Sequence, residues 1–166
     1  VIYINDQENI KDNYKKYPKK VLNNFMYANS IHLVDFIRIF ARGNLLDVKT
    51  IFNLKTKSSH SFAKSLKFSS GDIVVFTSFW ERPAPWSLSI STENYFFDMK
   101  PLESLQVKSK KNKKKIIFSQ KLDDINFKSG LMMQAQKIVE KINNKKNFFP
   151  GVKEILHTTN LINRIF

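Results

Sequence analysis

The chain has 166 residues, of which 42% are hydrophobic, and a formal net charge of +14 at pH 7. This length and hydrophobic content fit one folded domain with a sizeable core and argue against a disordered chain. The absence of cysteine excludes disulfides and thiolate metal sites, and it is compatible with the cytoplasm, where we expect the protein to work.

The sequence shows no signal for a membrane or for secretion. Its longest apolar run, residues 73–76, is far too short to cross a bilayer, and the N-terminus lacks the basic and apolar segments of a signal peptide. The chain begins with a strand-like stretch at Val1 and not with methionine. We therefore expect it to be a piece of a longer protein.

The positive charge raises the question of nucleic-acid binding. Lysine supplies nearly all of this charge, and arginines, which suit bidentate contacts with phosphates and bases, are few. Six lysines fall in one run, KSKKNKKK at 108–115, which is typical of a solvated loop. We therefore expect no specific nucleic-acid partner.

The first predicted elements are a strand and a helix. Residues 1–4 are strand formers, and Pro18 interrupts the polar stretch that follows them. Residues 29–40, NSIHLVDFIRIF, have the apolar spacing of a helix that Asn29 or Ser30 would cap and the next glycine would end.

Alternating apolar and polar residues predict a run of strands after this helix, joined by short turns. The predicted strands cover 46–54, 62–68, 73–80, 86–90, 95–99 and 102–107, with a last one at 116–118 beyond the lysine run. Consecutive strands joined in this way form a mainly antiparallel sheet.

Helical spacing returns near the C-terminus, where two apolar stripes are expected to lie in the core. The stripes are Leu131, Ala135 and Ile138, and Val152, Ile155 and Ile162. The whole chain, 1–166, is predicted to be one α+β domain with a mainly antiparallel, open-faced sheet of about six strands and helices packed on one face.

The open face of this sheet is expected to bind a second copy of the chain. The residues assigned to it are Val74, Phe76 and Trp80 on one strand, and Ser87, Ser89 and Ser91 on the next. Aromatic side chains beside small serines suit a flat partner better than bulk water. We therefore expect a homodimer or tetramer through this face.

No nucleotide-binding or metal-binding motif is present. The four glycines are scattered and form no dinucleotide or phosphate loop, so we expect no cofactor-binding residue in this chain. The three histidines lie far apart, and none has a second ligand at metal spacing, so we expect no metal site.

His32 has the surroundings of an acid–base group. It falls in the first turn of the predicted helix, where the helix dipole disfavours a protonated imidazole, and Asp35 is close enough in sequence to bias the orientation of the ring. A neutral, oriented imidazole can accept or donate a proton. A histidine at such a position is also compatible with a structural role in the core.

Four stretches, taken in order, resemble the C-terminal domain of the Gfo/Idh/MocA family of NAD(P)-dependent sugar oxidoreductases. They are YPKKVLNNFMYANSIHLVDFIRIF at 17–40, FSSGDIVVFTSFWERPAPWSLSISTENYFFDMKPLESL at 68–105, SGLMMQAQKIVEKI at 129–142 and VKEILHTTNLINRIF at 152–166. The first is similar to the family's histidine-bearing helix, the second to its hairpin, tryptophan turn and PLE strand, and the last two to its closing helices.

In that family an N-terminal Rossmann domain binds NAD or NADP and supplies a catalytic lysine, while the C-terminal domain covers the substrate and often forms the oligomer contact. The resemblance matches His32 to the histidine proposed as acid/base at the oxidised sugar hydroxyl. The family often has an aspartate four residues earlier, where this chain has Ala28.

The resemblance also indicates residues that would contact the substrate. Asn29 is suited to hydrogen-bond a sugar hydroxyl, and Tyr27 to line the same pocket. Trp80, Arg82 and Trp86 flank a proline-rich turn, where they could stack on a sugar ring or clamp a phosphate. Both tryptophans are equally compatible with an aromatic core.

The resemblance therefore implies the substrate-covering and oligomerisation domain of an oxidoreductase that removes a hydride from a ring carbon of a sugar or nucleotide sugar. NAD or NADP would be bound by the other half of the parent protein, and this chain alone would be inactive. Two alternatives stay open: a non-catalytic relative that binds a glycan precursor or a protein partner, and a basic nucleic-acid-binding module.

Overall fold

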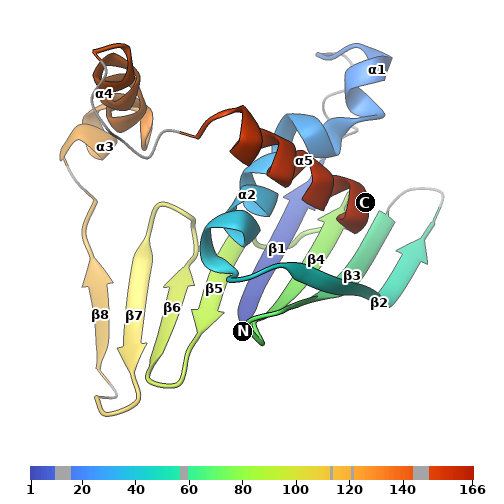
Figure 1. Ribbon diagram of the computed structural model, residues 1–166, viewed down its shortest axis with the longest axis horizontal. Helices are drawn as coiled ribbons and strands as arrows, with labels where there is room; N and C mark the ends of the chain where they lie inside the picture. Colours follow the sequence, from blue (N-terminus) through green and yellow to red (C-terminus); the bar gives the residue numbers. More distant parts are fainter. Residues whose placement is uncertain (10–15, 57–59, 113, 121, 144–149) are drawn as a thin grey trace.

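The computed structural model describes residues 1–9, 16–56, 60–112, 114–120, 122–143 and 150–166. Within these residues eight strands form one sheet (Figure 1), in the order β2-β3-β4-β1-β5-β6-β7-β8. The strands are β1 (Ile2–Glu8), β2 (Leu45–Lys55), β3 (His60–Phe68), β4 (Ile73–Trp80), β5 (Ser87–Ser91), β6 (Tyr95–Met99), β7 (Leu105–Ser109) and β8 (Lys115–Phe118). β1 and β4 run parallel, and the other neighbouring strands are antiparallel.

The helices lie before and after the long run of strands. They are α1 (Lys19–Leu22), the π-helical turn η2 (Met26–Ser30), α2 (Ile31–Phe40), α3 (Leu122–Asn126), α4 (Leu131–Ile142) and α5 (Val152–Ile165). Figure 1 shows α2 and α5 together over β1, β3 and β4, on one side of the sheet. None of the helices in the described residues is long and apolar enough to cross a membrane.

The core lies between these two helices and the central strands. Ile4 on β1 pairs with Phe76 on β4 and with Leu88 on β5, and all three side chains are fully buried. The helices complete the core with Leu33, Val34 and Ile37 from α2 and Leu161, Ile162 and Ile165 from α5. Burial of these apolar side chains fixes both helices on the same face of the sheet.

The predicted fold class is confirmed: an α+β fold with a mostly antiparallel sheet and helices on one face. The sheet has eight strands where about six were expected. β4 and α2 end where the sequence predicted, whereas β7 begins at Leu105 and not at residue 102. The lysine run does join β7 to β8, although its residue 113 lies outside the described residues, as do residues 10–15 of the polar stretch after β1.

The predicted assignment of the two faces of β4 was wrong. Phe76 is fully buried under the helices, and Trp80 points to the same side. The side chains of Val75 and Phe79 therefore belong to the open face, because successive residues of a strand alternate between faces. Both faces of β4 are apolar, so the sequence pattern alone could not tell which one the helices cover.

The prediction of two buried stripes was also wrong in large part. No residue of α4 is buried, and Leu131 and Ile138 are 50% and 42% exposed. In α5 the first turns are exposed at Val152 and Ile155, and burial begins at Thr158. The reason is visible in Figure 1, where α3 and α4 lie together away from the sheet and α5 reaches the core with its second half.

Candidate functional site

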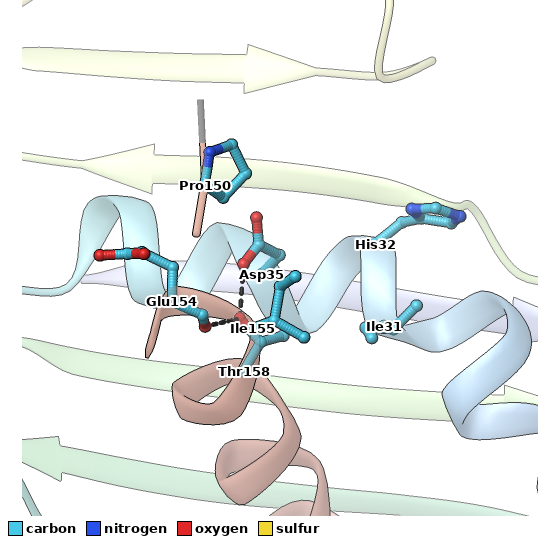
Figure 2. A pocket seen from close by; sticks show the side chains of 7 residues that line it. All are labelled: Ile31, His32, Asp35, Pro150, Glu154, Ile155 and Thr158. Carbon is cyan, nitrogen blue, oxygen red and sulfur yellow. Dashed lines mark hydrogen bonds between the residues drawn. The ribbon is translucent and has the colours of Figure 1, made fainter. Parts of the chain in front are cut away.

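His32 lies at a small pocket between α2 and the beginning of α5. The pocket has a volume of about 180 Å³ and is lined by Ile31, His32, Asp35, Pro150, Glu154, Ile155 and Thr158. Figure 2 shows the imidazole turned away from the Asp35 carboxylate. The ring is exposed and forms no hydrogen bond with any residue that the structure describes, so it is free to meet a ligand.

Asp35 is held by two other residues. Its carboxylate accepts hydrogen bonds from Arg38 at 2.7 and 3.0 Å and from the Thr158 hydroxyl at 2.5 Å. Burial raises the pKa of Asp35, but these hydrogen bonds outweigh it and hold the pKa below its ordinary value. Asp35 and His32 interact through their charges without a hydrogen bond, and an orienting role for Asp35 stays a prediction.

The helix that carries His32 begins earlier than expected. The turn η2 runs directly into α2, and Ser30 has helical backbone angles and makes no capping hydrogen bond. His32 is therefore not in the first turn of its helical segment, and the argument from the helix dipole loses its basis. The side chains of Asn29 and Ser30, the two predicted caps, reach strand β1 instead.

Ser30 belongs to a buried cluster around Asp6. One oxygen of this carboxylate, Oδ2, accepts hydrogen bonds from the Ser30 hydroxyl at 2.9 Å, the Ser78 hydroxyl at 3.0 Å and the Trp80 indole at 3.0 Å. Asp6 is fully buried, and this burial raises its pKa against the opposing effect of its donors. The Trp86 indole N–H and the second carboxyl oxygen of Asp6, Oδ1, are also buried, and neither has a hydrogen-bond partner among the described residues.

Glu8 lies two residues further along β1 and faces the same side. It is 6% exposed, and its carboxylate accepts a hydrogen bond from the side-chain amide of Asn29. Burial and, second, the negative charge of Asp6 raise the pKa of Glu8 to about 7, against the effect of Asn29. A carboxyl group of this kind changes its protonation near neutral pH.

The structure thus brings only some of the predicted residues together. Trp80, Trp86 and Asn29 surround the carboxylates of β1. Tyr27 is 39% exposed, and its hydroxyl donates to the side chain of Asn163 on α5. Arg82 is half-buried in the turn after β4.

The sequence reading missed the two carboxylates of β1. Asp6 and Glu8 follow Ile2 and Ile4 at every second position of β1, so they lie on the same, buried face of the strand. Two acidic residues on the core face of a strand need partners, because an unpaired buried charge is costly. This alternation could have identified them as members of a site.

The described residues contain neither a glycine-rich phosphate-binding loop nor a cluster of metal ligands. The glycines with positive φ, Gly43, Gly71 and Gly130, lie in three separate turns, so they do not form a phosphate-binding loop. No group of three or more potential ligands in the described ranges is placed to hold a metal ion.

Comparison with solved structures gives the fold a context. No protein-family model matches the sequence, and no curated protein matches it. The structure resembles a dehydrogenase from Chromobacterium violaceum with a TM-score of 0.76 at 16% identity, covering 99% of this chain and 51% of that one. It resembles the UDP-N-acetylglucosamine 3-dehydrogenase of Acidithiobacillus ferrooxidans with a TM-score of 0.75 at 8% identity, covering 99% and 51%. For an NAD-binding protein from Listeria innocua the TM-score is 0.62 at 12% identity, covering 97% and 50%.

These similarities define a class of fold. The chain spans about half the length of the dehydrogenases that it matches, and nearly all of it takes part in the match. The chain therefore has the fold of one half of these dehydrogenases.

Proposed function

We propose that this chain is the substrate-binding and oligomerisation domain of an NAD(P)-dependent oxidoreductase that acts on a sugar or nucleotide sugar. A ring carbon of the substrate gives up a hydride to a nicotinamide held by the other half of the parent protein. The proton of the hydroxyl on the same carbon passes to His32. Such an enzyme would work in the cytoplasm.

The exposed position of His32 carries this proposal. Its imidazole borders a pocket, makes no hydrogen bond with a described residue, and sits in a fold shared with halves of several dehydrogenases. The imidazole is accessible at the pocket and is not engaged by a described side chain. A free imidazole at a pocket can take up a proton from a bound hydroxyl group.

The proposal is tested in the whole enzyme, with UDP-N-acetylglucosamine as the first substrate to try and NAD and NADP as cofactors. Loss of a proton-transfer group lowers kcat by roughly 10²- to 10⁴-fold, and we expect this for His32→Ala with a smaller effect on KM. His157→Ala is the matched control, because His157 is exposed on α5 and is not among the residues that line the pocket. If His32→Ala and the control have similar kcat values, His32 is not the acid–base group.

The alternative is a non-catalytic relative that binds a glycan precursor or a protein partner. Ala28 favours it, because the resemblance places an acidic residue at this position in many active members. In that case no nicotinamide would be reduced in the whole protein by any sugar tested.

A further inference from the structure

The two ends of the Asn29 carboxamide are in different situations. Its amide nitrogen, Nδ2, donates to Oε1 of Glu8 on strand β1. Its amide oxygen receives no hydrogen bond from any residue in the described part of the chain, and the side chain is half-buried. Since a carboxamide has one donor end and one acceptor end, Asn29 presents an acceptor to its surroundings.

Glu8 is well placed to hold this orientation. Its side chain is almost completely buried, and its main-chain carbonyl accepts a hydrogen bond of 2.7 Å from the Glu81 amide. Behind it, Asp6 is fixed by its donors from η2 and β4. The carboxyl of Glu8 accepts through Oε1, which it can do in either protonation state, and so it holds the NH₂ end of Asn29 toward β1.

Asn29 and His32 are neighbours on the same helical segment. They lie three residues apart across the junction of the π-helical turn η2 and α2, and Asn29 stands two residues before Ile31, the first residue of the pocket lining. A sugar ring carries hydroxyl groups on adjacent carbons. One of them can donate to the oxygen of Asn29 while the next one meets the imidazole of His32.

We propose that Glu8 is a positioning residue: it turns the carboxamide oxygen of Asn29 toward the substrate, so that the site next to His32 selects a ligand with a hydroxyl donor. The selection of a hydroxyl donor rests on the proposed function, whereas the orientation of Asn29 does not. Glu8 acts through Asn29 and does not contact the ligand.

The orientation is tested without any ligand, by nuclear magnetic resonance of the ¹⁵N-labelled protein. The side-chain NH₂ signal of Asn29 is identified by its absence in Asn29→Ser. We expect its protons to exchange with water about tenfold more slowly than those of the exposed Asn23, as expected for one hydrogen bond. Equal exchange rates for the two side chains in the unmodified protein would overturn the proposal.

Two variants of Glu8 separate positioning from packing. Glu8→Met keeps the length of the side chain but removes the acceptor, so the slow exchange of Asn29 should be lost. Glu8→Gln keeps an acceptor oxygen, and its new NH₂ group is attracted to Asp6, so the slow exchange should be retained. Slow exchange that persists in Glu8→Met would show that another group holds Asn29.

The consequence for the ligand is measured in the whole enzyme with UDP-N-acetylglucosamine. Glu8→Met should raise KM about tenfold with a smaller change in kcat, and Glu8→Gln should behave as the unmodified enzyme does. An active enzyme in which Glu8→Met leaves KM unchanged would overturn the role of Asn29 in selection. A protein with slowly exchanging Asn29 protons that oxidises no sugar would contradict the proposed function and still support the orientation.

Discussion

Ser30 and Asp6 join helix α2 to strand β1: the Ser30 hydroxyl donates a hydrogen bond of 2.9 Å to the Asp6 carboxylate, and both side chains are fully buried. This bond ties the beginning of the His32 helix to the middle of the sheet. Because both groups are out of contact with water, loss of either partner would leave the other as a buried polar group with one hydrogen bond fewer. The same interaction links the stability of the fold to the geometry of the candidate site.

Removing this bond should destabilise the protein measurably. We expect Ser30→Ala to lower the free energy of unfolding by about 1–3 kcal/mol, because the buried carboxylate loses one of its donors. Urea unfolding followed by circular dichroism measures the change. Ser91→Ala is the control, since Ser91 is half-buried and its hydroxyl makes no hydrogen bond with a described residue. Similar losses in the two variants would mean that the bond to Asp6 contributes nothing specific.

The raised pKa of Glu8 predicts how stability depends on pH. The pKa of this carboxyl group rises from 4.5 in the unfolded chain to about 7 in the folded protein, so the folded protein binds the proton more tightly. Its contribution to stability is therefore complete below pH 4.5 and is lost as the pH rises through 7. The pKa of Asp6 is raised as well, so its contribution has the same sign.

Urea unfolding between pH 5 and 8 tests this sign. The unmodified protein should lose up to about 3 kcal/mol of stability toward the upper end, and Glu8→Gln should lose less. The carboxyl groups of Asp35 and Asp72, whose pKa values are lowered, act in the opposite sense but only in more acidic solution. His60, whose pKa is lowered by burial, acts in the opposite sense within this range, so the comparison between the two proteins isolates Glu8. The same pH dependence in the unmodified protein and in Glu8→Gln would show that Glu8 titrates normally.

Local periodicity predicted where the helices and strands lie in the sequence. Which face of each element is buried depends on pairing between residues far apart in the chain. The bounds of β4 were readable because eight consecutive strand-forming residues stand between two turn signals. Which face of β4 is buried depends on its register with β1, where Ile4 pairs with Phe76. Because β4 is apolar on both faces, its sequence does not indicate which face is buried. The stripe of α4 likewise indicates that one side of the helix needs a partner without naming the partner.

The candidate site was readable only in part for the same reason. His32 could be singled out from its helix and from the resemblance of that helix to a family pattern. The hydrogen bond from Ser78 to Asp6 joins residues 72 positions apart in the sequence. The sequence around each of them gives no indication of the other. The alternation of β1 does indicate that Asp6 and Glu8 lie on its buried face. Their hydrogen-bond partners could be identified only from the folded structure.

The chain by itself is expected not to bind a nicotinamide cofactor. A dinucleotide site needs a glycine-rich turn at the beginning of a helix, where main-chain N–H groups meet the phosphates. Isothermal titration calorimetry of this chain with NADH and NADPH should therefore show no saturable site in the micromolar range. A tight, stoichiometric site would contradict the proposal that the other half of the parent protein binds the nicotinamide.

The open face of the sheet is expected to join two copies of the chain. Tyr3 on β1 lies between Val75 on β4 and Ser89 on β5, and it is 41% exposed although it is a large aromatic residue in the middle of the sheet. Phe79 extends the same surface toward Phe52 on β2, at a ring-centre distance of 6.4 Å. A face with aromatic groups beside small serines can approach its own copy closely about a two-fold axis.

Light scattering at micromolar concentration should therefore give at least twice the monomer mass of 19.5 kDa. Val75→Lys should give the monomer, because two lysines would be buried against each other across a two-fold contact. Leu156→Lys is the matched control: it places the same charge on an exposed apolar residue of α5, on the other side of the sheet, and should leave the mass unchanged. The core residue Phe76, which the sequence had placed on the open face, is unsuitable for this test, since a charge there would unfold the protein. A monomer mass for the unmodified chain, or an unchanged oligomer in Val75→Lys, would exclude assembly through this face.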